Sequence, residues 1–358
     1  RGQRNGNARL AARLWPGRTV GIMRAVQMTG FGEPAEVLRV EELETPVPEP
    51  GQVRVRMLAS PVNPSDVMTI RGTYGRRPSL PFTPGYEGVG VVEESGGGLL
   101  GALRRNKRVV VLNSITGNWA EQAVAPARQV VPVPDSLSVQ QAATFFINPV
   151  TAYVMVQRVL QIPPGGWLLQ TAAGSQLGRM VIRLGRRLGF KTINIVRRDE
   201  QIEELVQLGG DHVLSFRVDE QSGEELLQLV DDITGGGGVS SAIDPVGGPL
   251  GSAVLGCLGR RGRMLCYGTL DERPLEFSPR ELMTREASVE GFWLGPWLAS
   301  QGLLAKLRLI KTVAGLVTAG VLDSEIGETF SLERVVDAVT ASETPGRDGK
   351  VLLEMGAS

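Results

Sequence analysis

The segment WLLQTAAGSQLGRMVIRLGRRLGFKTINIVRR, residues 167–198, gives the strongest indication of how this chain folds. It begins with the apolar run WLLQT and ends with a second apolar run, TINIV. Between them, apolar residues recur at helical spacing before a glycine that can end a helix: Leu177, Val181, Leu184, Leu188 and Gly189. A strand, a helix and a strand in this order predict two parallel strands joined by a crossover helix.

The same alternation continues after residue 198, through HVLSF, ELLQLVDDI, SSAIDPV, GRMLCYG and ASVEGFW. Strands that alternate with helices predict a parallel sheet covered on both faces, of the doubly wound α/β class. We expect this domain to span residues 151–294.

The part before it, residues 23–150, has a different pattern. Short alternating strands are broken by Pro and Gly: RAVQM, VLRVEEL, QVRVRMLAS, GVGVVEE, KRVVVL and WAEQAVA. This pattern predicts a compact antiparallel barrel. Residues 295–358 add the helix LLAKLRLIKTVAGLVTAG and the strand KVLLEM. A chain of 358 residues is long enough for two such domains.

The amino-acid composition limits the kinds of partner that the protein is expected to bind. Lys plus Arg equal Asp plus Glu at 38 each, so no overall basic field favours nucleic acid or an anionic membrane. Two cysteines, Cys257 and Cys266, and one histidine, His212, favour a reducing compartment and leave few metal ligands. No apolar run approaches the ~20 residues of a membrane span. These features predict a cytoplasmic protein with a small-molecule substrate.

Residues 1–22 have a composition of their own, with five Arg and no acidic residue. This is typical of an organellar transit peptide, for mitochondria or plastids. The alternative is an upstream extension, because Met23 opens the first predicted strand. We exclude this segment from the fold, and an organellar location is the alternative to the cytoplasm.

The turn after WLLQT consists mostly of small residues: Ala173, Gly174, Ser175, Gln176, Leu177 and Gly178. Of the general fingerprint G-x-G-x-x-G, only the third glycine, Gly178, is kept. The setting between a strand and an amphipathic helix lets backbone N–H groups face a pyrophosphate. We predict a dinucleotide site here, with an ordinary tight turn as the alternative.

Arg197 and Arg198 end the second strand, where a ribose-binding residue is expected. A ribose 2′-hydroxyl needs an acceptor, whereas a 2′-phosphate needs donors, and guanidinium groups supply them. The arginines therefore predict NADPH, with Arg197 favoured because it follows the strand directly. Alternatively, Asp199 and Glu200 make them part of a solvated charge cluster.

Four motifs resemble the medium-chain dehydrogenase/reductase superfamily: NPSDVMTIRGTYG (63–75), PGYEGVGVV (84–92), INPVTAYVM (147–155) and GKVLLEM (349–355). The resemblance covers nearly everything from Met23 onward. It implies a GroES-like catalytic domain, residues 23–150 and 295–358, with a Rossmann NADPH-binding domain inserted at 151–294.

Many members of that superfamily bind a catalytic zinc through Cys and His ligands that include the His of a Gly-His-Glu motif. Here the motif is Gly85-Tyr86-Glu87, and the N-terminal domain contains neither Cys nor His. A zinc site needs N and S donors in a tetrahedron. We therefore predict no metal.

Two zinc-free branches remain, the mitochondrial-type 2-enoyl thioester reductases and the zeta-crystallin-like quinone oxidoreductases. The chain is more similar to the first, through NPSD with GTYG, Ser175, GFWLGPW (291–297) and TINIVRR. The chain departs from the pattern of these reductases at two places. Gln176 stands where a glycine is common, and its longer side chain can crowd or bind the pyrophosphate. The residues around Tyr86 also differ.

The resemblance implies a reaction in which hydride passes from the nicotinamide to the β carbon of an enoyl thioester. The phenol of Tyr74 is expected to donate a hydrogen bond to the developing enolate oxygen. Asn63 orients Tyr74 or the nicotinamide, or only forms a turn before Pro64. The alternative for Tyr74 is a loop aromatic packed on a glycine-rich turn.

Further expected contacts come from the later motifs. Thr151 opens the helix beside the nicotinamide, or only caps it. Tyr267, Gly268 and Lys350 are predicted to contact the coenzyme. Three aromatic residues line an acyl pocket or belong to the core: Phe292, Trp293 and Trp297. His212 is expected at the surface or beside the second ribose, without a catalytic role.

These features predict an NADPH-dependent reductase of enoyl-CoA or of enoyl groups on an acyl carrier protein. The alternatives are an NADPH quinone or enone reductase and a nucleotide-binding protein without catalytic activity, since fold does not fix function. A homodimer is implied by the resemblance alone.

Overall fold

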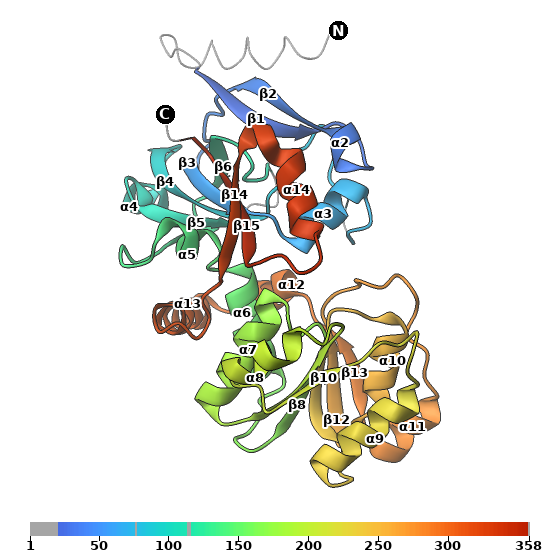
Figure 1. Cartoon of the computed structure of the whole chain (residues 1–358). Helices are drawn as coiled ribbons and strands as arrows, with labels where there is room; N and C mark the ends of the chain where they lie inside the picture. The colour runs from blue at the N-terminus through green and yellow to red at the C-terminus, as the bar shows by residue number, and fades with distance from the viewer. Residues whose placement is uncertain (1–20, 76, 113–115, 357–358) are drawn as a thin grey trace. The chain divides into compact units, whose positions relative to one another are not determined.

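The computed structural model describes residues 21–75, 77–112 and 116–356 (Figure 1). The predicted extension, residues 1–22, lies outside this range except for its last two residues. The chain forms two compact units. The first contains residues up to Val133, Gly327–Arg347 and Val351 onward, and the second contains Pro134–Ile326 and Asp348–Lys350.

The first unit is built on antiparallel strands. Strands β1 (Ile22–Met28) and β2 (Leu38–Glu44) pair with each other. A larger sheet has the order β14-β15-β3-β4-β5-β7, and β6 also pairs with β3. Its strands are β3 (Gln52–Pro61), β4 (Glu87–Ser95), β5 (Arg108–Leu112), β6 (Gln122–Pro126), β7 (Val130–Pro132), β14 (Ile326–Ser331) and β15 (Lys350–Glu354).

Short helices accompany these strands, as the scarcity of long helical patterns predicts: α2 (Pro34–Val37), α3 (Pro64–Arg71), α4 (Leu99–Arg104), the 3₁₀ turn η2 (Leu332–Arg334) and α14 (Val335–Glu343). Strand β15 pairs with β3, with Leu352 opposite Pro61. The C-terminal segment is therefore part of the same sheet as the N-terminal strands.

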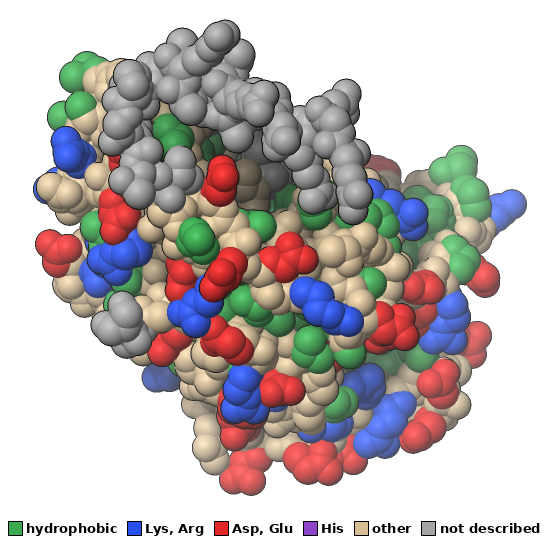
Figure 2. Space-filling view, turned by 90° about the horizontal axis from the view of Figure 1, so that it is seen from above, with side chains coloured by type: hydrophobic (Ala, Val, Ile, Leu, Met, Phe, Trp, Pro, Cys, Tyr) green, Lys and Arg blue, Asp and Glu red, His purple; other side chains and the backbone are tan. Residues whose placement is uncertain are grey.

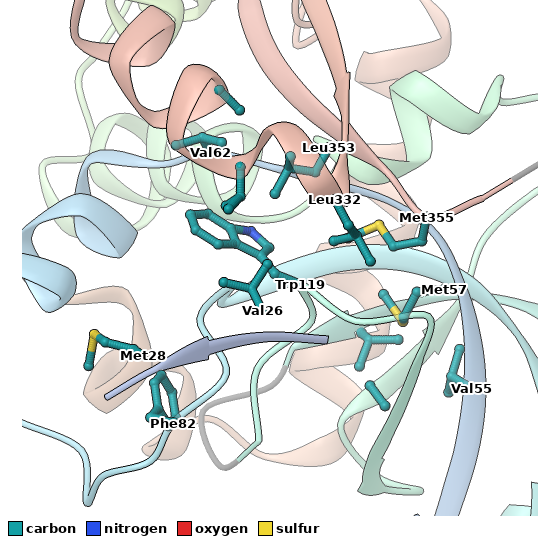
Figure 3. Packing of buried hydrophobic residues seen from close by; sticks show 14 of the residues in the cluster. Val26, Met28, Val55, Met57, Val62, Phe82, Trp119, Leu332, Leu353 and Met355 are labelled. Atoms are coloured by element: carbon teal, nitrogen blue, oxygen red, sulfur yellow. The ribbon is translucent and has the colours of Figure 1, made fainter. Parts of the chain in front are cut away.

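The core of the first unit surrounds Trp119, which is fully buried (Figure 3). Side chains from distant segments pack here, including Val26 of β1, Met57 of β3 and Leu353 of β15. Because burial of each large apolar side chain contributes roughly 1.5–3 kcal/mol, this cluster holds the terminal segments against the sheet.

The second unit contains a six-stranded parallel sheet in the order β10-β9-β8-β11-β12-β13. Leu168 of β8 lies between Thr192 of β9 and Ser241 of β11. The strands are β8 (Trp167–Gln170), β9 (Lys191–Val196), β10 (His212–Ser215), β11 (Val239–Asp244), β12 (Leu258–Cys266) and β13 (Ser288–Gly291). The doubly wound parallel sheet is confirmed.

The second unit also contains helices (Figure 1). They are α5 (Val139–Ala143), α6 (Ile147–Val154), the π-helical turn η1 (Met155–Val159), α7 (Gln176–Leu188), α8 (Gln201–Leu208), α9 (Gly223–Thr234), α10 (Gly248–Gly256), α11 (Pro279–Arg285), α12 (Leu294–Ala299) and α13 (Leu303–Thr318).

Helix α7 forms as its sequence predicts. Ser175 is its N-cap, and its side chain accepts a hydrogen bond from the N–H of Gly178 at 3.1 Å. Leu177, Val181 and Leu184 are buried, and Gly189 ends the helix with φ of 84°. This left-handed conformation is readily available only to glycine.

The boundaries between the units differ from those predicted. Residues 134–150 and 295–326 belong to the second unit and not to the first. The reason is helix packing, because α6 packs against α7 and α13 packs against α6. A strand pattern shows where a sheet ends, but it does not show which sheet a flanking helix covers.

The surface has mixed charge. On the face drawn in Figure 2, acidic and basic side chains are interspersed, in keeping with the equal totals of 38. Within the part of the chain that the structure describes, no helix is both long and apolar enough to cross a membrane.

Candidate functional site

The turn between β8 and α7 requires small residues. A Cβ atom on Gly178 would lie 2.4 Å from the backbone oxygen of Ala173, so the helix can approach the strand only with glycine at this position. Ala172 adopts a positive φ of 49°. The Nε of Arg179 donates to the oxygen of Gly174 at 3.2 Å and closes the turn. These features fit a pyrophosphate facing the N-terminus of α7.

The residues that follow the parallel strands meet at one edge of the sheet. Arg197 follows β9, Arg217 comes two residues after β10, Asp244 ends β11 and Tyr267 follows β12. The strand order reverses at β8, with β9 and β10 added on one side and β11 on the other, and ligands of open α/β sheets bind in the crevice at such a point. We call this edge of the sheet the coenzyme edge.

A third arginine joins the predicted ribose-phosphate site. Arg217 donates from Nε to the backbone oxygen of Arg197 at 3.1 Å, and its terminal nitrogens lie 3.4 Å from Asp199 and 3.3 Å from Glu220. The sequence interpretation missed Arg217. The available signal was its position directly after the apolar run HVLSF, since neighbouring parallel strands end at the same edge.

The carboxylate next to the arginine pair has its own partners. A hydrogen bond from Ser215 and the nearby charge of Arg217 lower the pKa of Asp199. Among the described residues, neither Arg197 nor Arg198 takes part in an ion pair. Arg197 is exposed and Arg198 is half-buried, so both the phosphate site and the solvated charge cluster stay open for these two side chains.

A buried pair lies at the point where the strand order reverses. The hydroxyl of Thr171 donates to Asp244, and both side chains are fully buried. Asp244 also accepts hydrogen bonds from the N–H groups of Val246 at 3.0 Å and Gly247 at 2.8 Å. These bonds fix the loop after β11. The sequence interpretation missed both residues, although an acid that closes an apolar strand was a usable signal.

Tyr267 and Gly268, which are predicted to contact the coenzyme, follow β12 at the coenzyme edge. The N–H of Tyr267 donates to the oxygen of Asp244 at 2.9 Å. Burial, with a smaller effect of Asp244, raises the pKa of Tyr267, which keeps its phenol neutral. A Cβ on Gly268 would lie 2.7 Å from the oxygen of Pro245, so two loops approach closely here.

Gln176 and Lys350 are joined through the backbone of Glu325. The Oε1 of Gln176 accepts a hydrogen bond from the N–H of Glu325 at 3.1 Å. The N–H of Lys350, a buried residue, donates to the oxygen of Glu325 at 2.7 Å. The long side chain of Gln176 therefore links the first turn of α7 to residues 348–350, which accounts for one departure from the family pattern.

Two expectations are corrected. Thr151 does not open its helix, because α6 begins at Ile147 and Thr151 lies in its interior, buried at 7% exposure. His212 is exposed at the first residue of β10, with its ring 5.6 Å from Trp167, which begins β8. It lies at the edge opposite the coenzyme edge, so the surface alternative holds and the ribose alternative is wrong.

The predicted aromatic pocket residues follow β13. Trp293 is the N-cap of α12 and is half exposed, and its backbone oxygen accepts from the N–H of Trp297 at 3.2 Å. The N–H of Phe292 donates to the oxygen of Cys266 at 2.8 Å. The exposure of Trp293 argues against a core position for this ring.

In the first unit, buried carboxylates organise the start of α3. Asn63 is the N-cap, and its N–H donates to Asp66 Oδ2 at 2.8 Å. The Nδ2 of Asn63 donates to Glu87 Oε1 at 3.0 Å. The three side chains are 1–2% exposed. Buried carboxylates are tolerated when such donors satisfy them, so Asn63 does more than form a turn.

Tyr74 lies beside Tyr86, the residue that replaces the histidine of the Gly-His-Glu motif. Their ring centroids are 5.6 Å apart with planes at 40°. The phenol of Tyr86 lies 2.8 Å from the hydroxyl of Thr69. We call Asn63, Asp66, Thr69, Tyr74, Tyr86 and Glu87 the tyrosine cluster. Within the described ranges, no group of three or more His, Cys, Asp or Glu is arranged to hold a metal ion.

Comparisons with known proteins identify the family of each part of the chain. Residues 49–135 match the family of alcohol dehydrogenase GroES-like domains, and residues 177–308 match the family described as zinc-binding dehydrogenase. The chain is 33% identical over 337 residues to the human mitochondrial enoyl-[acyl-carrier-protein] reductase, covering 93% of this chain and 89% of the relative. The corresponding Schizosaccharomyces pombe protein is 31% identical, with 91% of each chain covered.

Solved structures are similar over nearly the whole chain. A Bacillus thuringiensis protein described as a "putative NADPH:quinone reductase" has a TM-score of 0.85 at 31% identity, covering 93% of this chain and 99% of that one. A mycobacterial protein complexed with NADPH has a TM-score of 0.82 at 26% identity, with coverage of 93% and 99%. The chain therefore belongs to the medium-chain dehydrogenase/reductase superfamily, as an oxidoreductase of its zinc-free branch of enoyl and quinone reductases that use a nicotinamide coenzyme.

Proposed function

We propose that this protein uses NADPH to reduce the C=C bond of 2-enoyl thioesters. Tyr74, a phenol held beside a second tyrosine in the GroES-like unit, is the candidate donor for this reduction, and the observation that carries the choice of a thioester is the similarity to relatives with that activity in their names. Curated relatives named enoyl-[acyl-carrier-protein] reductase, at up to 33% identity over 93% of the chain, support the same substrate class.

The choice of NADPH rests on the coenzyme edge. Arg197 is exposed and Arg198 half-buried directly after β9, with Arg217 beside them. Guanidinium groups bind a phosphate through paired hydrogen bonds. Ser175, Gly178 and the N-terminus of α7 would hold the pyrophosphate. Bound NADPH would supply the hydride, and the residues of this chain would orient it.

Tyr74 would act on the substrate oxygen. As hydride adds to the β carbon, the C=C electrons move toward the thioester carbonyl and form an enolate, which then takes a proton at the α carbon. A hydrogen bond from Tyr74 to this oxygen strengthens as charge develops, so it lowers the barrier. A phenol with a reference pKa of about 10 is a donor at neutral pH, and it can also deliver the α proton.

Asn63 would support Tyr74 indirectly. Its side-chain amide is bonded to Glu87 and its backbone to Asp66. Both bonds fix the start of α3, and the loop with Tyr74 begins where α3 ends, with the N–H of Tyr74 donating to the oxygen of Met68 at 3.1 Å. We assign Asn63 a positioning role.

The test is a steady-state comparison of substrates. NADPH oxidation is measured with crotonyl-CoA or decenoyl-CoA and, separately, with 1,4-benzoquinone. The proposal expects kcat/KM for a thioester to exceed that for the quinone by at least tenfold. A reversed ratio selects the quinone reductase, and NADPH binding without turnover of either compound selects a protein without this catalytic activity.

The quinone reductase is the second candidate because a specific observation favours it. The Bacillus thuringiensis structure has a TM-score of 0.85, and its description names quinone reduction. A quinone carbonyl also gains charge at oxygen when it takes hydride, so Tyr74 can serve both reactions. A quinone substrate needs no channel for a pantetheine arm, whereas a thioester substrate does. Activity with long-chain thioesters therefore distinguishes the enoyl reductase from the quinone reductase.

A carrier protein, a dimer and an organellar location complete the proposal. The relatives' names include an acyl carrier protein and mitochondria. Strand β13 lies at the end of the parallel sheet, so its outer edge is available to pair with a second copy. Light scattering of the purified protein tests the dimer, and localisation of a tagged full-length protein tests the compartment. The arginine-rich residues 1–20 lie outside the described residues.

A further inference from the structure

Tyr86 is fixed from several directions within the first unit. Its N–H donates to Asp66 Oδ1 at 3.0 Å, and its phenol lies 2.8 Å from Thr69 Oγ1. The preceding residue, Gly85, has φ of 100°, and a Cβ there would lie 2.4 Å from Trp119 Cδ1. Because Trp119 is fully buried in the core, the backbone at Gly85 has no room to shift.

The hydrogen bond between Thr69 and Tyr86 has a defined direction. The hydroxyl of Thr69 donates to the backbone oxygen of Ser65 at 2.8 Å. A carbonyl oxygen only accepts, and a hydroxyl carries one proton. Tyr86 must therefore donate to Thr69. The phenol is directed toward α3, where Thr69 is 1% exposed, while Tyr86 itself is half-buried.

The two oxygens of Asp66 couple Tyr86 to the start of α3. One accepts from the N–H of Asn63 and the other from the N–H of Tyr86. Since Asn63 also donates to Glu87, the residue after Tyr86, the chain on both sides of Tyr86 is tied to one helix. Tyr86 is thus part of a rigid buried network, while Tyr74 lies on the loop that follows α3.

We propose that Tyr86 is a positioning residue that holds Tyr74 in its reactive orientation. Its ring packs against the ring of Tyr74, and its phenol, anchored on Thr69, keeps that ring in place. This inference rests on the proposed function, because it assigns Tyr86 an effect that is exerted only through the hydroxyl of Tyr74.

The test is a set of substitutions made both in the native protein and in Tyr74→Phe. Tyr86→Leu removes the ring contact, and we expect kcat with an enoyl-CoA to fall roughly tenfold, since small displacements of a reacting group are costly. Tyr86→Phe and Thr69→Val each remove the same hydrogen bond. We expect each to lower kcat by about threefold and their combination to lower it no further.

In the Tyr74→Phe background these substitutions are expected to change kcat by less than about twofold, because the group they position is absent. The NADPH dissociation constant, measured by fluorescence titration, should stay constant throughout. Thr340→Val is the matched control, since Thr340 donates to the oxygen of Val336 at 2.9 Å in α14 of the same unit. It should leave kcat unchanged.

The outcomes are distinguishable. The positioning role is overturned if Tyr86→Leu lowers kcat equally in the native protein and in Tyr74→Phe. It is also overturned if the folded Tyr86→Leu variant has an unchanged kcat. Both results leave the proposed function intact. If Tyr74→Phe alone leaves thioester turnover unchanged, the proposed mechanism fails and this inference fails with it. Thermal unfolding checks each variant, and if Tyr86→Leu does not fold, Tyr86→Phe and Thr69→Val decide the question.

Discussion

The coenzyme edge and the tyrosine cluster are two candidate sites that are built in different ways. At the coenzyme edge, strand ends and one helix N-terminus supply backbone donors, and exposed arginines add charge. In the tyrosine cluster, buried side chains from residues 63–69 bond to residues 86 and 87. In our proposal, the first arrangement binds a coenzyme mainly with groups that strand ends and a helix N-terminus provide. The second holds the phenol of Tyr74 in place and therefore needs a specific network of side chains.

The largest effect is expected at Tyr74. Tyr74→Phe removes the donor to the developing enolate and should lower kcat with an enoyl-CoA at least tenfold, up to the ~3 kcal/mol typical of one such donor. NADPH affinity should be nearly unchanged, because the coenzyme edge is intact. Steady-state kinetics with a fluorescence titration measure both. An unaltered kcat would remove Tyr74 from the mechanism and make the tyrosine cluster purely structural.

The second-largest effect is expected at the coenzyme edge, as a loss of NADPH affinity. Arg197→Ala should weaken NADPH by roughly 10- to 100-fold, the range for a lost charge-assisted contact, and change NADH little. Arg217→Ala should act in the same direction but less, because Arg217 also bonds to Asp199 and Glu220. Arg187→Ala, an exposed arginine near the C-terminal end of α7, is the control.

Isothermal titration with both coenzymes measures these constants. If NADPH and NADH lose affinity equally, the arginines do not read the 2′-phosphate. If Arg217→Ala weakens NADPH binding more than Arg197→Ala does, then Arg217 is the main phosphate ligand. The phosphate site then lies at the end of β10 rather than at the end of β9.

The third effect concerns backbone packing. Gly178→Ala places a methyl group 2.4 Å from the oxygen of Ala173 and should destabilise the protein by about 1–3 kcal/mol. Gly256→Ala is the matched helical control, because no atom lies within 4 Å of its new Cβ. Thermal unfolding compares the two. If Gly178→Ala is as stable as the control, then β8 and α7 can move apart to accommodate the methyl group. Close packing is then not the reason for glycine at this position.

The smallest effect is expected in the reactivity of the two cysteine thiols. Burial, with a smaller effect of Asp231 and against the opposing charge of Arg285, raises the pKa of Cys257 to about 12. Burial with the charge of Asp244 raises the pKa of Cys266 to about 11. Since the thiolate is the nucleophile, both thiols should react slowly with a disulfide reagent at pH 8 and faster as pH rises. Unfolded protein should react at once. Rapid labelling of the native protein would show that the coenzyme edge opens near Cys266.

The sequence predicted the coenzyme edge better than the tyrosine cluster, for a physical reason. The turn at 173–178 and the arginines at 197 and 198 lie in one segment whose periodicity shows its fold. Arg217 and Asp244 were missed because they reach the same edge only through strand order. Strand and helix positions followed from hydrophobic patterns, whereas the unit boundaries depended on helix packing that no pattern records.

The tyrosine cluster depends on contacts that local patterns cannot show. The sequence leaves Asn63 open between orienting Tyr74, orienting the nicotinamide and forming a turn, because the bonds from Asn63 to Glu87 and from Tyr86 to Thr69 join segments about twenty residues apart. The prediction that Thr151 opens a helix is wrong. In the structure the apolar residues before it already belong to α6.

The most direct test of the account follows the transferred atom. The protein is incubated with decenoyl-CoA and NADPH in which both hydrogens at C4 of the nicotinamide are replaced by deuterium, and the saturated product is examined by NMR and mass spectrometry. The account predicts one deuterium on the β carbon and a solvent-derived proton on the α carbon. A product with deuterium at the α carbon or without deuterium would contradict hydride transfer to the β carbon, and an absence of product would contradict the proposed activity.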